Sequence, residues 1–231
     1  MSALASSLSA PARRAAPAGR WAATSAAAVV VAAAVLTAPD ARAEPARGSE
    51  GEAVEPAPTA RPWMRLELDE YFAGERAEGS VFMGLGASSM FGGGVAYAQG
   101  AEWSRGASAP LLAFGVVHFA VGAVVWARSN DQAARLRAIL RRNPARLRDL
   151  ELARMDRVNR QFRWLALVEI GLAAAGAGLA SYGVVADKPG WTGAGVALGV
   201  ESLVTLGLDY FAARRAADYT RALETFDPAL R

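Results

Sequence analysis

Four long apolar stretches, separated by polar segments, dominate the second two-thirds of the chain. Each has 19 to 23 residues, enough to cross about 30 Å of hydrocarbon at the helical rise of about 1.5 Å per residue. A membrane-spanning segment must satisfy its own backbone hydrogen bonds, so the pattern predicts four transmembrane helices. They are residues 80–98, 109–127, 164–186 and 191–213. A water-soluble bundle is the alternative, and long helices almost free of charge disfavour it.

The order of the stretches predicts an all-α fold, a four-helix transmembrane bundle made of two helical hairpins. The hairpins cover residues 80–127 and 164–213, and a basic, Arg-rich helical loop over 128–163 joins them. Tryptophan side chains favour the headgroup level of a bilayer. Those at or near the ends of the stretches are Trp103, Trp126, Trp164 and Trp191. Residues 214–231 are a C-terminal tail.

Within the loop, a helix capped by Asn130 or Asp131 is expected to end before Pro144, because proline disfavours helix at the residue before it. A second helix is expected from Pro144 into the third span.

The N-terminal region has the pattern of a signal peptide. Arginines precede an apolar run over residues 21–36, and small residues at Ala41 and Ala43 form a cleavage site. We therefore predict a signal peptide over 1–43; an uncleaved anchor is the alternative. Residues 44–79 form an acidic Pro/Ala-rich linker and a short amphipathic helix, about 63–78, which we expect at the membrane surface and leading into the first span.

The charge distribution conflicts with a simple topology. The loop over 128–163 has eleven arginines and four acidic residues, which predicts a cytoplasmic position. A signal peptide followed by four spans puts it outside. Three explanations stay open: 80–98 does not cross fully, residues 44–79 stay in the cytoplasm, or the chain is an exception to the rule. In the last case the acidic 44–79 segment and the basic loop share one side and could pair.

Small residues recur on the spans and predict tight helix packing. The pattern also favours a homo-oligomer or a membrane-protein partner. The predicted packing residues are Gly84, Ser88, Gly92 and Ala96 in the first span, Gly115 and Gly122 in the second, and Gly195 and Gly199 in the fourth.

Ionisable residues inside spans are costly and so are candidates for function. His118 and Glu201 fall near the middle of their spans, and Glu169 lies nearer the interface. We expect His118 and Glu201 to pair across helices, either as a polar pin that fixes helix register or as a site for a proton or cation. Asp209 is expected to be an interfacial group near Arg214.

Composition excludes several kinds of chemistry. The chain has no cysteine and one histidine, which excludes thiolate sites and metal sites that need two histidines. No hydrolase, P-loop or dinucleotide motif is present. We therefore expect no enzyme, cofactor or metal. The basic loop lacks interleaved aromatic residues, so we expect no nucleic acid and take the lipid bilayer as its partner.

The stretch from Arg154 to Trp164 (RMDRVNRQFRW), with the glycine-rich hairpin after it, resembles small multi-span membrane proteins of high-GC bacteria. That resemblance implies no activity and no site residues. The predicted signal and spans indicate a multi-pass protein of the bacterial inner (cytoplasmic) membrane. The expected role is structural or accessory; the alternative is a small transporter or channel component that uses His118 and Glu201.

Overall fold

The computed structural model describes residues 62–228, which form four long α-helices and no strand. The helices have 37 to 42 residues, so each is about 56 to 63 Å long at helical rise. They are α2 (Pro62–Gln99), α3 (Glu102–Arg142), α4 (Pro144–Val185) and α5 (Pro189–Thr225). The predicted signal peptide with Ala41 and Ala43, and most of the linker, lie outside the described residues.

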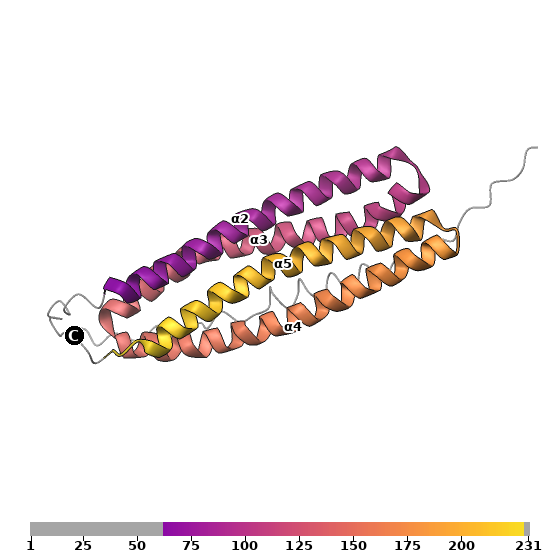
Figure 1. Cartoon of the computed structure of the whole chain (residues 1–231). Helices are drawn as coiled ribbons and strands as arrows, with labels where there is room; N and C mark the ends of the chain where they lie inside the picture. The colour runs from indigo at the N-terminus through magenta and orange to yellow at the C-terminus, as the bar shows by residue number, and fades with distance from the viewer. Residues whose placement is uncertain (1–61, 229–231) are drawn as a thin grey trace, which may run out of the picture.

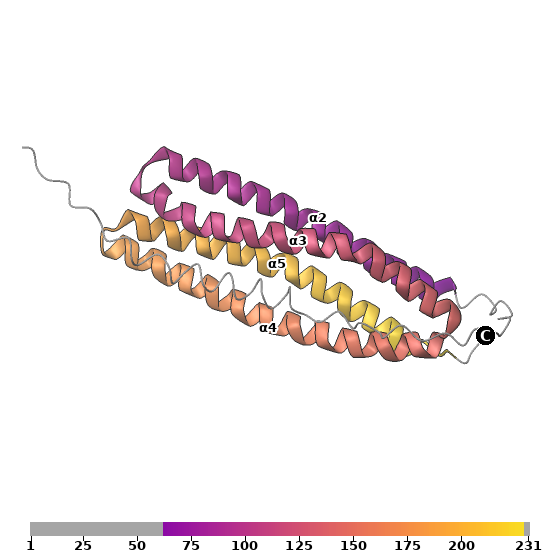
Figure 2. The ribbon, with the colours of Figure 1, turned by 180° about the vertical axis from the view of Figure 1, so that it is seen from behind.

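The helices form two antiparallel hairpins that lie side by side, α2 with α3 and α4 with α5 (Figures 1 and 2). The tight turns of both hairpins lie at one end of the bundle, which we call the turn end. The start of α2, the α3–α4 connection and the end of α5 lie at the opposite end, which we call the polar end. The predicted all-α fold with two hairpins is confirmed. Because both hairpins start at the polar end, α3 and α5 run parallel.

The loop between the hairpins is shorter than predicted. The sequence contains no helix breaker between residues 128 and 142, so α3 continues to Arg142 without a cap at Asn130 or Asp131. Asn130 instead accepts a hydrogen bond from Arg76 of α2. The predicted break before Pro144 is confirmed: Asn143 caps α4, and its side-chain oxygen accepts from the Arg146 N–H at 2.9 Å.

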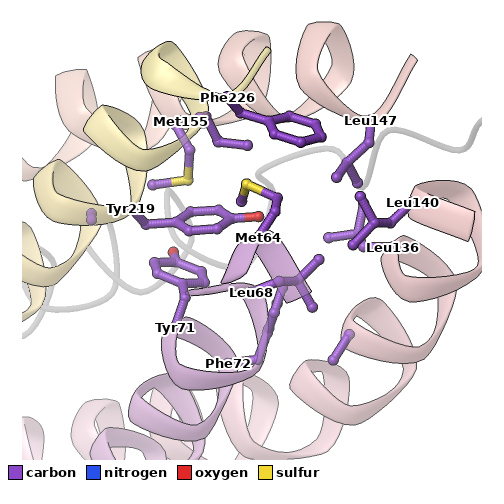
Figure 3. Close-up of a cluster of buried hydrophobic side chains, with 13 residues drawn as sticks. Met64, Leu68, Tyr71, Phe72, Leu136, Leu140, Leu147, Met155, Tyr219 and Phe226 are labelled. Carbon is purple, nitrogen blue, oxygen red and sulfur yellow. The ribbon is translucent and has the colours of Figure 1, made fainter. Parts of the chain in front are cut away.

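The polar end is packed like a water-soluble bundle. Large apolar side chains from all four helices fill its centre (Figure 3). The residues of this core, which we call the polar-end core, are Met64, Leu68, Tyr71, Phe72, Ala133, Leu136, Leu140, Leu147, Met155, Ala216, Tyr219, Leu223 and Phe226. We expected the amphipathic segment 63–78 to form a separate helix at the membrane surface, and this expectation is wrong. The segment is the first part of α2, and its apolar side chains complete this core.

The other half of the bundle has the opposite distribution. Buried positions there are mostly glycine, alanine and serine, and large apolar side chains point outwards. Val185 is 87% exposed, Phe91 76% and Leu167 63%. Exposing such an apolar surface to water is unfavourable, whereas exposing it to lipid acyl chains is not. All four helices are long and apolar enough to cross a membrane.

Exposed aromatic residues mark the two edges of this apolar surface. Trp126 and Trp164 lie towards the polar end, and Tyr97 and Trp103 lie at the turn end. Trp103 and Trp126 are about 35 Å apart along α3 at helical rise, close to the thickness of the hydrocarbon layer. Aromatic belts of this kind sit at membrane interfaces. We call the part between the belts the membrane half.

The structure also reduces the conflict over topology. Residues 80–98 lie in the uninterrupted α2, which runs along α3, so they form no re-entrant hairpin. The start of α2 and the α3–α4 connection are at the same end, and the two segments pair there. Arg137 Nε lies 2.5 Å from Asp69 Oδ1. The acidic and basic segments thus share one end of the bundle.

Candidate functional site

Close backbone contacts join the two helices of the first hairpin. Only some of the predicted helix-packing residues take part in them. A Cβ atom added at Gly79 would lie 2.8 Å from the Gly122 carbonyl, and one at Gly115 would lie 2.8 Å from the Gly86 carbonyl. The contact on α2 therefore follows Gly79, Gly86 and Gly93, which are seven residues apart. Seven residues are close to two helical turns and keep one face.

The predicted stripe on α2 is wrong because it repeats every four residues and so turns around the helix. Gly84 and Gly92 have nothing within 4 Å of an added Cβ, and Ser88 is exposed, while Ala96 is only partly buried. Ser88 bonds only back to the Gly84 carbonyl.

The second hairpin uses the same kind of contact. A Cβ at Gly176 of α4 would lie 2.6 Å from the Gly199 nitrogen and 2.8 Å from the Gly195 carbonyl of α5. The hairpins meet where Gly106 of α3 faces Gly190 of α5, because a Cβ atom added at Gly106 would collide with the Gly190 carbonyl. The membrane half is thus held by backbone-to-backbone packing.

The structure brings His118 and Glu201 together in the middle of the membrane half. His118 Nδ1 lies 3.8 Å from Glu201 Oε2, and both side chains are almost completely buried. Ser89 Oγ donates to Glu201 Oε1 at 2.7 Å, so α2 joins the contact between α3 and α5. The rings of Phe82 and Phe114 pack against the imidazole.

The hydrogen bonds around His118 determine where its proton lies. Thr205 Oγ1 donates its only hydrogen to the Glu201 carbonyl at 2.8 Å. It also contacts His118 Nε2 at 2.8 Å. When its hydrogen is on the Glu201 carbonyl, Thr205 accepts at this contact and Nε2 carries a hydrogen. Nδ1 of a neutral His118 then faces Glu201 Oε2 with a lone pair.

Neither Nδ1 nor Oε2 has another hydrogen-bond partner among the described residues. Two lone pairs that face each other at 3.8 Å are unfavourable, and one proton on either the histidine or the carboxyl group removes the conflict. In both arrangements the pair has no net charge, which suits a membrane interior. The His118–Glu201 pair is therefore a site for one proton.

A second pair lies one to two turns closer to the polar end. The Glu169 carboxyl group of α4 lies beside that of Asp209 of α5. Two neighbouring carboxylates repel each other, and one proton on the pair removes this repulsion. We expected Asp209 to be an interfacial group near Arg214; in the structure it also lies beside Glu169. Glu169 itself is 6% exposed.

A cleft of about 620 Å³ runs beside both pairs, between α3 and α4, which contact each other less than the other neighbouring helices do. His118, Thr205, Glu169 and Asp209 line its deep part. Arginines of α3 and α4 line the part towards the polar end. The cleft therefore connects the buried pairs with the polar end.

A third polar cluster lies in the polar-end core. Tyr219 and Tyr71 stack with ring centroids 4.5 Å apart, and their hydroxyl groups donate to Glu151 and Glu75. Arg154 forms an ion pair with Glu151. Burial raises the pKa of both phenols well above their usual range, and the two glutamates raise it further. Both tyrosines therefore stay neutral.

Sequence reasoning found His118, Glu201 and Glu169, but it missed the residues that complete their hydrogen bonds. Ser89 and Thr205 are ordinary small polar residues in apolar stretches and have no distinguishing pattern. The spacing of Thr205 four residues after Glu201 was the available signal, since residues four apart share a helix face. Across residues 62–228, no three potential ligands are grouped to hold a metal ion.

Comparison with known proteins finds no matching family model, no similar curated protein and no similar solved structure.

Proposed function

We propose that the protein is a multi-pass membrane protein of structural or accessory role, in a bacterial inner membrane. The observation that carries the proposal is the backbone packing of the membrane half. Added Cβ atoms at Gly79, Gly115 and Gly176 would collide with neighbouring backbones or side chains, so the helices cannot slide past one another without losing these contacts. Such packing is better suited to a rigid scaffold than to a protein that changes conformation during its function.

In this proposal the His118–Glu201 pair is a polar pin. It joins α2, α3 and α5 through Ser89 and Thr205 at one level of the membrane half. An interhelical polar bond within a membrane is worth about 0.6 to 2 kcal/mol and fixes one register. A homo-oligomer or a membrane-protein partner stays a prediction, as does the absence of an enzyme activity.

A test separates the pin from a working proton site. The variant Glu201→Gln keeps an acceptor for the Ser89 hydroxyl and can donate to His118 Nδ1. The variant Glu201→Ala leaves Ser89 and His118 without this partner. We expect Glu201→Gln to unfold in detergent at the wild-type temperature, and Glu201→Ala to be less stable. In proteoliposomes, wild type and Glu201→Gln should show the same proton permeability as empty vesicles.

One observation favours a second candidate, a small transporter or channel component. The cleft places the His118–Glu201 and Glu169–Asp209 sites, each able to hold a proton, beside a path to the polar end. Chains of such groups carry protons in pumps and transporters. A proton flux that wild type supports and that the stable variant Glu201→Gln abolishes would establish this function and refute the scaffold.

A further inference from the structure

The cleft between α3 and α4 lies where the membrane half meets the polar end. Trp164, which is 70% exposed, lines it and belongs to the aromatic belt at that level. Because Trp164 both lines the cleft and is exposed on the outside of the bundle, the cleft reaches the side of the bundle at this level. A molecule in the surrounding lipid therefore has direct access to it.

The wall of the cleft is apolar on its membrane side. Large aliphatic and aromatic side chains of α3 and α4 form this part. They are Phe114, Val117, Val121, Leu165, Val168 and Leu172. The wall is long enough, at about 12 Å along α3 from Val117 to Val125, to take a good part of one acyl chain.

The polar-end side of the cleft carries more positive than negative charge. Five arginines line it, and three of them have an acidic partner: Arg154 pairs with Glu151, Arg160 with Asp156 and Arg215 with Glu78.

The other two, Arg128 and Arg157, form no ion pair with any residue in the described part of the chain. Arg128 Nε is also buried there without a hydrogen-bond partner. Glu75, the remaining carboxylate at this level, accepts hydrogen bonds from the neutral hydroxyl groups of Tyr71 and Ser129. Its charge offsets part of the positive charge, but it forms no ion pair with Arg128 or Arg157.

We propose that this cleft binds an anionic membrane lipid. Arg128 and Arg157 hold the headgroup phosphate, and one acyl chain lies along the apolar wall. A guanidinium group matches the oxygens of a phosphate with two parallel hydrogen bonds. Positive charge at the headgroup level beside an apolar wall is complementary to an anionic amphiphile, whereas a simple anion would leave the apolar wall uncovered.

The first test measures lipid preference in nanodiscs of phosphatidylcholine with and without phosphatidylglycerol, by native mass spectrometry of the released protein. We expect wild type to retain phosphatidylglycerol selectively. Each arginine near an anionic headgroup contributes about fivefold in affinity, so Arg128→Gln/Arg157→Gln should lower the preference about 30-fold.

The matched control is Arg135→Gln/Arg141→Gln, which removes the same charge from exposed positions of the same basic segment outside the cleft. It should keep the wild-type preference. If both double variants lose the preference equally, or neither does, the cleft is not the lipid site.

The second test distinguishes a lipid from a free phosphate. Val168→Trp fills the apolar wall without changing charge, and Val200→Trp adds the same ring on the exposed face of α5. Only the first should lower phosphatidylglycerol retention. If neither variant lowers retention and water-soluble glycerol phosphate competes fully, the site recognises phosphate alone and the lipid assignment fails.

The third test identifies the occupant directly. The chain has no cysteine, so Val121→Cys can carry a single photoreactive label within the cleft. We expect illumination in phosphatidylglycerol nanodiscs to give a protein–lipid adduct by mass spectrometry. A cross-link to residues 21–36, a cross-link to a second copy of the chain, or no adduct at all would overturn the proposal.

Discussion

At the residue scale, the central feature is the buried pair of His118 and Glu201, which is neutral when it holds a single proton. The sequence located both residues, because ionisable groups stand out in apolar stretches. It could not give the tautomer, which depends on Thr205 giving its hydrogen to the Glu201 carbonyl. Such a detail follows from three-dimensional contacts and has no sequence signature.

The tautomer can be checked on its own, because His118 is the one histidine of the chain. In protein labelled with ¹⁵N-histidine, we expect a protonated Nε2. Glu201→Gln should leave a neutral ring with the proton on Nε2. Glu169→Gln, one to two turns away, should leave the spectrum unchanged. A ring protonated only on Nδ1 would contradict the assignment.

The two stacked tyrosines predict a loss of stability at alkaline pH. Tyr71 and Tyr219 have raised pKa values because they are buried beside glutamates. The unfolded chain ionises near the usual tyrosine pKa of about 10, and the folded chain does not. The stability that the neutral phenols contribute is therefore complete below about pH 10 and is lost as the pH rises above it.

Thermal unfolding in detergent at about pH 9 and about pH 11 measures this loss. Tyr219→Phe removes one titrating group and should flatten the dependence on pH. Equal slopes in the two proteins would show that the buried phenol of Tyr219 does not contribute to the loss.

At the scale of the helices, the sequence predicted the four spans but not the faces by which they pack. Glycine and alanine are so frequent that several stripes can be drawn, and the four-residue stripe over Gly84 and Gly92 was the wrong one. The sequence also led us to divide α2 and α3, since their polar and apolar parts differ in composition. Helix continuity depends on the absence of a breaker rather than on composition.

Two glycines of α4 provide a matched test of the packing. A side chain at Gly176 would meet the backbone of α5, while Gly178 has nothing within 4 Å. We expect Gly176→Val to lower the free energy of unfolding by about 1 to 3 kcal/mol or more, the usual cost of overpacking. Gly178→Val should have little effect. Unfolding in mixed micelles measures both, and equal losses would refute the assigned α4–α5 contact.

At the scale of the whole molecule, the bundle has two halves with opposite packing. The polar-end core has large apolar residues inside, and the membrane half has them outside. The sequence predicted the membrane half because spans have a simple signal. It assigned 63–78 to the membrane surface because an amphipathic helix on lipid and one in a bundle core have the same periodicity. Only the partner helices distinguish these two environments.

The account therefore rests on a bundle that crosses the membrane four times, with its two ends on opposite sides. Single cysteines can be placed at Asn143 and Thr225 of the polar end and at Gly100 and Asp187 of the turn end, since the chain has none of its own. Labelling intact vesicles with a membrane-impermeant maleimide should modify one pair and protect the other until detergent is added. Labelling of all four positions from the same side would contradict the four crossings.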